Sequence, residues 1–214
     1  MDTRISADVL RRYTDLPSLL HLLGGKRLTL LDPRTWDDTN DSYYLLKYKE
    51  KKSLKTLLAL CLTQAEETYH HWRVFSQGSS GVCIHFNRRV FVDTLLRHRG
   101  MTVRAVEYRR VRDVRRRPVA PAIADLPFLK RAGFSAESEV RVIFESATKA
   151  LPYLDVPIAL TSIDKITLSP WLNKRLSATV KEIVSAMPDC AGINVRRSTL
   201  VGNTLWKKLG DEAA

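Results

Sequence analysis

The chain has 214 residues, of which 44% are hydrophobic and 27% charged; these proportions fit a soluble globular protein and exclude a disordered or fibrous one. No apolar run approaches the roughly 18 to 20 residues that span a bilayer, and the polar, charged start does not resemble a secretory signal. The net charge of +12 favours a polyanionic partner such as nucleic acid or nucleotide phosphates. We therefore expect a cytoplasmic protein with no membrane partner, folded as a single domain over 1–214 with its core at about 9–208.

The first predicted elements are a strand, a helix and a second strand. The first strand is expected at 9–14. Asp15 suits the N-cap of a helix with Pro17 in its first turn, and leucines at helical spacing give that helix a buried stripe before the glycines at 24–25 end it. A second strand is expected at 26–31.

The middle of the chain alternates polar turns with apolar segments. Residues 37–41 form a polar cluster typical of a turn. The strongly apolar segment 54–63 is either a buried strand or a helix that runs into one. The elements expected after it are a helix at 66–75, a loop at 78–81, a strand at 82–86, a helix at 88–97 and a strand at 101–108.

The last part of the chain begins with an irregular segment at 118–127, which prolines interrupt. Strands are expected at 136–145, 165–168 and 193–200, with a helix at 171–187 before the last of them. Strands and helices mix without regular βαβ alternation, and neither a dinucleotide-binding glycine fingerprint nor a phosphate loop is present. The sequence therefore predicts an α+β fold with a mixed β-sheet flanked by helices.

The tripeptide Glu137-Ser138-Glu139 is the most informative feature of the sequence. Alternation of side chains from this point predicts a half-buried strand that presents Glu137, Glu139 and Arg141 on one face. Two neighbouring carboxylates repel each other, so the pKa of one should be raised unless Arg141 or a ligand compensates. Such an arrangement is typical of a catalytic or binding site. The alternative is an edge strand whose outer face carries a solvated ladder of glutamate and arginine.

An arginine-rich segment accounts for much of the positive charge. Nine arginines lie between residues 97 and 117, against only Glu107 and Asp113. Arginine grips phosphate through two parallel hydrogen bonds and stacks on bases, so the segment could bind nucleic acid. The alternative is a flexible solvated loop that serves solubility. The residues expected to bind are Arg109, Arg110, Arg112, Arg115, Arg116 and Arg117.

No metal site is expected from the cysteines and histidines. Cys61, Cys83 and Cys190 form no C-x-x-C pair, and an odd number of free thiols suits a reducing compartment. His70 and His71 are adjacent, so the two side chains cannot face one metal ion from a regular element. The prediction is a protein without a bound metal.

Several stretches, taken in order, resemble a bacterial and phage family known as domain-of-unknown-function family 2971. The resemblance covers roughly residues 10–200, and Asn40-Asp41 departs from the family in being followed by Ser42 rather than proline. The stretches include Arg12-Tyr-Thr14, Trp36-Asp-Asp-Thr-Asn-Asp41, Leu60-Cys-Leu-Thr63, His71-Trp-Arg-Val-Phe75, Gly81-Val-Cys-Ile-His-Phe86 and Glu137-Ser-Glu-Val-Arg141. Membership in this family implies no particular activity.

A second resemblance does imply an activity. The order of Arg12 and Thr14 on a first strand, Thr63 after a middle strand and a final Glu137-x-Glu139 resembles the ADP-ribosyltransferase layout. The resemblance implies a split sheet, NAD as substrate and Glu139 as the catalytic glutamate, with Glu137 directing the acceptor. Residues implied or suited to hold NAD are Arg12, Tyr13, Thr14, Thr63 and Arg141, with Tyr43 or Phe75 as further stacking partners.

Three function classes follow from these features. The first is an NAD-consuming transferase, such as a toxin or phage-defence effector with a nucleic-acid acceptor or partner, in which replacing Glu139 abolishes turnover and leaves stability nearly unchanged. The second is a non-catalytic nucleic-acid-binding module that uses 97–117. The third is a degenerate transferase scaffold used for protein interaction. Convergence of Arg12, Thr63 and Glu139 on one cleft would distinguish the first class from the others.

Overall fold

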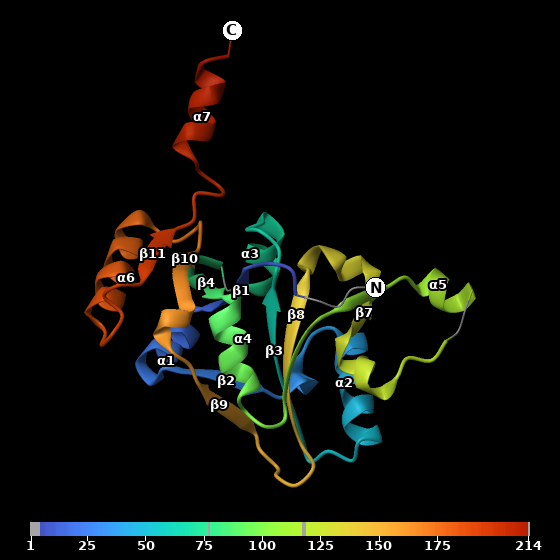
Figure 1. Cartoon of the computed structure of the whole chain (residues 1–214). Coiled ribbons are helices and arrows are strands. Elements are labelled where there is room, and N and C mark those ends of the chain that lie inside the picture. The colour runs from blue at the N-terminus through green and yellow to red at the C-terminus, as the bar shows by residue number, and fades with distance from the viewer. Residues whose placement is uncertain (1–4, 77, 117–118, 214) are drawn as a thin grey trace.

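The computed structural model describes residues 5–76, 78–116 and 119–213, in which one large sheet is flanked by helices (Figure 1). The large sheet contains β1 (Val9–Asp15), β2 (Arg27–Leu31), β3 (Thr56–Thr63), β4 (Gly81–Asn87), β5 (Met101–Ala105), β8 (Glu139–Ser146), β9 (Tyr153–Pro157), β10 (Ile163–Leu168) and β11 (Asn194–Arg197). The helices are α1 (Leu16–Gly25), α2 (Thr39–Lys51), α3 (Tyr69–Phe75), α4 (Arg88–Leu96), α5 (Val111–Arg116), α6 (Lys174–Ala186) and α7 (Thr204–Asp211). Two short strands, β6 (Glu107–Arg109) and β7 (Leu129–Arg131), pair in parallel beside the large sheet.

The large sheet is mixed and mostly antiparallel. Its strand order is β11-β10-β4-β1-β3-β2-β9, and β8 pairs with both β3 and β5. In this sheet of the described chain, only β10 and β11 run parallel to each other. Together with the flanking helices this confirms the predicted α+β class with a mixed sheet.

The two edges of β3 are paired very differently. One edge pairs with β8 over the full strand, from Thr56 opposite Ser146 to Thr63 opposite Glu139. On the other edge, β1 and β3 share a single register position, Arg11 opposite Thr63, whereas β1 pairs with β4 throughout. Beyond Arg11, β1 therefore runs along β4 and away from β3, which leaves a gap beside Tyr13.

One face of the sheet carries the main hydrophobic core. Inward-facing residues of β4, β3 and β8 pack there against leucines of α1, against α4 and against α6. Burying each such leucine side chain contributes about 2 kcal/mol. Fully buried members include Leu10, Leu28, Leu30, Val82, Ile84, Phe86, Phe91, Val140 and Val142.

The opposite face of the sheet carries an unusual number of polar side chains. Arg11, Thr63, His85, Arg141 and Thr167 all lie on this face, and each is less than a tenth exposed. A smaller apolar cluster under α2 and the 3-10 segment Ile123–Phe128 covers one end of it. Buried polar groups need partners, and clusters of buried ionisable groups are typical of functional sites. A functional site is therefore expected on this face.

Most of the predicted elements are confirmed. β1, β2, β4 and β10 form where strands were expected, and the ambiguous segment 54–63 contains a strand. Helix α1 begins as predicted, with the Asp15 carboxylate accepting a hydrogen bond from the Ser18 amide at 2.8 Å. It ends at Lys26, which adopts a left-handed conformation with φ 48°.

Three expectations and one alternative were wrong. The polar cluster at 37–41 is not a free turn: Asp38 caps the N-terminus of α2, which the sequence pattern did not reveal. The strand expected at 101–108 is broken into β5 and β6. The arginine segment contains the helix α5 rather than a loop, although no residue of that helix is buried. The strand expected from 136 begins only at Glu139, because Glu137 ends a 3-10 segment, Ala132–Glu137.

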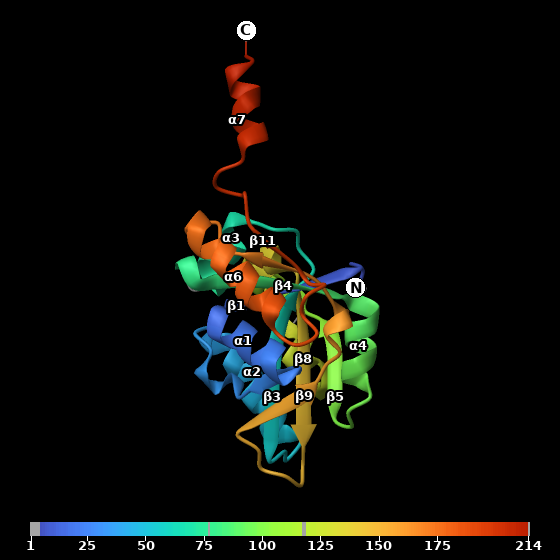
Figure 2. The ribbon, with the colours of Figure 1, turned by 90° about the vertical axis from the view of Figure 1, so that its left-hand side faces the viewer.

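The C-terminal helix α7 was also not predicted. It projects away from the body of the molecule (Figure 1 and Figure 2), and Leu205 and Trp206 are 75% and 76% exposed. No helix in the described ranges is both long and apolar enough to cross a membrane.

Candidate functional site

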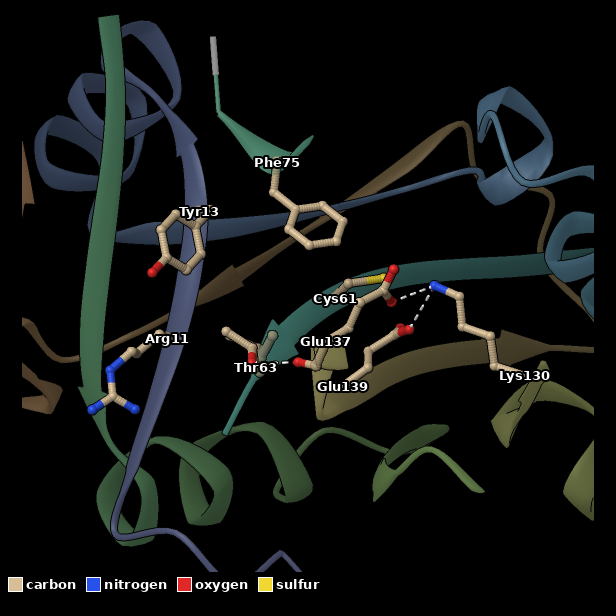
Figure 3. A pocket seen from close by; sticks show the side chains of 9 residues that line it. Arg11, Tyr13, Cys61, Thr63, Phe75, Lys130, Glu137 and Glu139 are labelled. Atoms are coloured by element: carbon tan, nitrogen blue, oxygen red, sulfur yellow. Dashed lines mark hydrogen bonds and ion pairs between the residues drawn. The ribbon is translucent and has the colours of Figure 1, made fainter. Parts of the chain in front are cut away.

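A cavity of about 150 Å³ lies where β1 leaves β3 (Figure 3). We call it the β1–β3 cavity. Strands β1 and β3 and helix α3 supply one side, and the segments around β7 and β8 supply the other. Its lining residues are Arg11, Tyr13, Cys61, Leu62, Thr63, Phe75, Lys130, Glu137 and Glu139.

Glu137 and Glu139 reach the cavity from two different elements. Glu137 ends the 3-10 segment and Glu139 begins β8, and Ser138 between them adopts a left-handed conformation with φ 44°. Two hydrogen bonds hold this corner: the Thr63 hydroxyl donates to the Glu137 carbonyl at 2.5 Å, and the Glu139 amide donates to the Tyr108 hydroxyl at 2.8 Å. The bend thus brings both carboxylates to one cavity without the strand geometry expected from the sequence.

Both glutamates belong to a buried charge cluster, defined here as Asp41, Lys130, Glu137, Glu139 and Arg141. The Arg141 guanidinium donates two hydrogen bonds to Asp41, each of 2.7 Å, and two to Glu139, of 2.7 and 3.0 Å. The Lys130 ammonium donates to Glu137 at 2.6 Å and to Glu139 at 3.2 Å. No side chain in the cluster is more than 9% exposed. Three acids and two bases therefore share a site from which water is almost excluded.

The cluster drives the pKa values of the two glutamates apart. Burial alone would raise the pKa of Glu139, but the charges of Arg141 and Lys130 outweigh burial and lower it to about 2. Burial raises the pKa of Glu137, and Lys130 only partly offsets that effect. Glu139 is therefore held as a carboxylate, whereas Glu137 takes up a proton more readily. Two neighbouring acids with divided roles are typical of acid–base sites.

Aromatic rings form the wall opposite the glutamates. Tyr13 and Phe75 line the cavity, and the His71 ring stacks on Tyr13 with centroids 5.4 Å apart. Burial lowers the pKa of His71, so its ring is neutral at physiological pH, and its Nδ1 lies 2.5 Å from the Thr68 hydroxyl. An apolar wall facing fixed carboxylates suits a flat ring next to a group that becomes positively charged.

Cys61 is the exposed thiol of the cavity, whereas Cys83 and Cys190 are buried. The pKa of the Cys61 thiol is raised well above its ordinary value. The larger cause is the loss of solvation by water at the sulfur atom, and the next is the negative charge of Glu139. A thiol with a raised pKa is a poor nucleophile at neutral pH. Cys61 is therefore a feature of the cavity wall rather than a reactive group.

Of the residues implicated by sequence, Tyr13, Thr63, Phe75, Glu137 and Glu139 meet in the cavity. Arg141 does not line it, but lies fully buried beneath Glu139. The sequence did not point to Arg11, Asp41 or Lys130. Arg11 is adjacent to Arg12 in sequence. Asp41 lies in a stretch that resembles family 2971 but gave no sign of contact with Glu139 or Arg141, and Lys130 lies in no local pattern that marks it.

Arg12 and Thr14 alternate with the cavity residues and so face the other side of β1. Arg12 lines a separate hollow of about 340 Å³ together with His21 and Arg27. It forms no hydrogen bond or ion pair with the described residues, and burial lowers its pKa to about 10 although Cys61 acts in the opposite direction.

The part of the arginine-rich segment that starts at Arg109 lies beside the same site. In the β6–β7 pair, Tyr108 lies opposite Lys130 and Arg109 opposite Arg131. Arg109 therefore directly follows Tyr108, whose hydroxyl accepts a hydrogen bond from the Glu139 amide. Arg109 pairs with Glu107 at 2.8 Å and Arg112 with Asp113 at 3.7 Å. Arg110, Arg115 and Arg116 are exposed. Arg117 lies outside the described residues.

Among the residues that the structure describes, no group of three or more histidine, cysteine, aspartate or glutamate side chains could hold a metal ion. The chain matches no protein-family model, and a search of curated proteins finds no similar sequence. The resemblances to family 2971 and to ADP-ribosyltransferases therefore stay predictions.

Proposed function

We propose that the β1–β3 cavity is the reaction site of an enzyme that cleaves the nicotinamide–ribose bond of NAD and transfers ADP-ribose to an acceptor. One observation carries this proposal: Thr63, Glu137 and Glu139 meet in a cavity whose opposite wall is Tyr13 and Phe75. Three residues that the resemblance to ADP-ribosyltransferases assigns to one site thus also lie close together in space.

The dimensions favour a ligand that enters the cavity with one end. Pockets for drug-sized molecules usually measure roughly 300 to 1,000 Å³, so a cavity of about 150 Å³ suits a single ring such as nicotinamide. The separate hollow of about 340 Å³, on the other side of β1, is lined by Arg12 and Arg27. A dinucleotide with its ring between Tyr13 and Phe75 could place its diphosphate against these arginines, where forked donors grip phosphate oxygens.

The charge cluster fits the electronic demand of the reaction. When the glycosidic C–N bond breaks, its electron pair leaves with nicotinamide and the ribose becomes an oxocarbenium-like cation, which a nearby carboxylate stabilises. Glu139 stays ionised because its pKa is about 2. Glu137, whose pKa is raised, would accept the proton of the attacking nucleophile as the new bond to the ribose carbon forms.

The decisive experiment measures nicotinamide release from NAD by the purified protein and by two matched variants. Glu139→Gln removes the cavity carboxylate, whereas Glu145→Gln removes a carboxylate of the same strand that instead pairs with Lys52 outside the cavity. We expect turnover by the wild type and by Glu145→Gln, and none by folded Glu139→Gln. Equal turnover by all three proteins, or none by any, would refute the proposal.

Because Glu139 is buried, its variant needs a control for folding. Circular dichroism and the urea midpoint should first show that Glu139→Gln is folded under the assay conditions. Tyr13→Ala offers a second test, since it removes one ring from the aromatic wall without altering the charge cluster. We expect it to raise the KM for NAD more than it lowers kcat, as loss of ring binding predicts.

A further inference from the structure

Beside the reaction site, the surface forms a groove lined with arginines. Its open part, of about 490 Å³, is lined by Arg109, Arg110, Arg112, Arg131 and small neighbours that include Gly133. Among the residues that the structure describes, no acidic one lines this part. We call it, together with the adjoining hollow described next, the arginine groove.

The adjoining hollow, of about 250 Å³, is apolar and aromatic instead. It is lined by Tyr44, Val114, Val119 and Pro121 and shares Arg109, Val111 and Arg131 with the open part. Because the two parts share these residues, they form one continuous depression. Cationic side chains line both parts of it, and the hollow adds apolar and aromatic side chains.

The guanidinium groups of the groove are largely available for a ligand. Arg110 and Arg131 form no ion pair with any residue in the described ranges. Arg109 is held by the partly buried Glu107 at 2.8 Å, whereas Arg112 has only the exposed Asp113, at 3.7 Å. Exposed pairs of that kind contribute little and exchange readily. Arg115 and Arg116, exposed on α5, extend the positive charge beyond the groove.

We propose that the arginine groove binds single-stranded nucleic acid. Phosphates would contact Arg110, Arg112 and Arg131, and an unpaired base would stack on Tyr44 and the apolar floor. Proteins that hold single strands combine these two features, a basic path for the backbone and aromatic surfaces for bases. A duplex keeps its bases stacked on one another and would use only the arginines.

The groove also reaches the reaction site. Lys130 lines both the apolar hollow of the groove and the β1–β3 cavity, and its ammonium lies 2.6 Å from a Glu137 carboxylate oxygen. A nucleotide in the hollow would thus approach Glu137, the carboxylate that accepts the proton of the attacking nucleophile in the proposed reaction. We infer that the bound strand is the acceptor of ADP-ribose. This inference rests on the proposed function.

Binding is tested by fluorescence anisotropy with labelled oligonucleotides, single-stranded and duplex, over a range of salt concentrations. The variants are the double substitution Arg110→Gln with Arg112→Gln, the single substitution Tyr44→Ala, and a control double substitution, Lys174→Gln with Arg175→Gln, at the start of α6. Figure 1 shows α6 and α5 on opposite sides of the molecule.

We expect the single strand to bind more tightly than the duplex, and the groove double variant to bind about tenfold more weakly. The logarithm of the binding constant should fall linearly with the logarithm of the salt concentration, and the loss of each arginine that binds a phosphate should reduce that slope by about 0.7. Tyr44→Ala should weaken single-strand binding and leave duplex binding unchanged. Equal weakening by the α6 control, a duplex that binds as well as the single strand, or equal binding to vesicles of anionic lipid would overturn the assignment.

The acceptor step is tested separately by incubating the bound strand with labelled NAD. Label transferred to the strand by the wild type, and not by the groove double variant, would support it. Nicotinamide release without transfer to the strand would overturn the acceptor role while leaving the binding site standing. Binding without any nicotinamide release would refute the proposed function itself and leave the groove as a binding site.

Discussion

The carboxylate of Asp41 and the guanidinium of Arg141 are joined by two hydrogen bonds of 2.7 Å, although 100 residues separate them in the chain. The side chain of Arg141 is 0% exposed and that of Asp41 2%. This pair anchors α2 to β8 and fixes Arg141, which in turn holds Glu139. The geometry of the cavity therefore depends on a residue that does not line it.

Asp41→Asn should destabilise the protein strongly. Removing one partner of a buried ion pair leaves the other charge uncompensated, which costs about 3 to 5 kcal/mol. Asp113→Asn is the matched control, because its pair with Arg112 is exposed and should contribute less than about 1 kcal/mol. Urea unfolding monitored by circular dichroism measures both. Similar midpoints for the two variants would show that the Asp41–Arg141 pair does not stabilise the fold.

Glu139→Gln should also cost stability, and the cost should vanish in acid. Burial is outweighed by Arg141, so the pKa of Glu139 falls from 4.5 to about 2 in the folded protein. The stabilisation by this carboxylate is therefore fully present above about pH 4.5 and is lost as the pH falls towards 2. It amounts to about 3 kcal/mol.

Unfolding free energies of the wild type and Glu139→Gln, compared from neutral pH down to acid, should converge below about pH 4.5. A difference that stays constant over this range would contradict the prediction. Convergence of the two curves in acid would replace the expectation from sequence that the substitution leaves stability nearly unchanged.

His85→Gln should make the protein less sensitive to mild acid. Burial, with the positive charges of Lys165 and Arg11, lowers the pKa of His85 from 6.5 to about 3. Between these values the unfolded chain binds a proton that the folded protein does not, so stability falls as the pH drops below about 6.5. The wild type should lose about 2 to 3 kcal/mol more than the variant by pH 4.5. His70→Gln, at an exposed position, should behave as the wild type does.

Occupation of the cavity should protect Cys61 from alkylation. It is the exposed thiol, while Cys83 and Cys190 are buried and serve as internal references. Mass spectrometry after maleimide treatment should find slow modification at Cys61, slower still with NAD present. Because NAD binding is read without turnover, this measurement remains informative for the Glu139→Gln variant. Unchanged labelling of Cys61 at saturating NAD would argue against a ring bound between Tyr13 and Phe75.

Thr63→Val should loosen the corner that carries Glu137. The Thr63 hydroxyl donates to the Glu137 carbonyl at 2.5 Å and accepts from the Ala65 amide at 2.9 Å. Valine has the same shape but leaves both backbone groups without this partner, at a cost of about 1 to 3 kcal/mol. Amide hydrogen exchange should rise around 136–139, and Thr102→Val on β5 is the control. Exchange that is unchanged at this corner would show that the hydroxyl does not hold it.

Local patterns were sufficient to predict much of the sheet and the first helix. Alternation and apolar runs located β1, β4 and β10, and the sequence Asp15-Leu-Pro-Ser18 located the start of α1 because capping depends on neighbouring residues only. Helix α2 was missed because Asp37 and Asp38 resemble a turn, and its polar exposed side chains hide the few buried positions Asp41, Leu45 and Tyr48.

The candidate site was predictable only in part, for a reason that concerns register. A shift of one residue exchanges the two faces of a strand, and the neighbours Arg11 and Arg12 give no chemical clue to which of them faces Thr63. The pairing of Arg11 with Thr63 settles this. Lys130 and Asp41 could not be foreseen, since they meet Glu139 only through contacts between distant segments.

The pairing of β3 with β8 has a consequence for synthesis on the ribosome. The charge cluster runs from Asp41 to Arg141, so it cannot close until roughly two thirds of the chain has emerged. Before β10 follows, the edge of β4 that β10 will cover is open, and an open strand edge invites pairing with other chains. The nascent protein thus passes through a stage in which its buried charge cluster is unfinished and one edge of its sheet is unpaired.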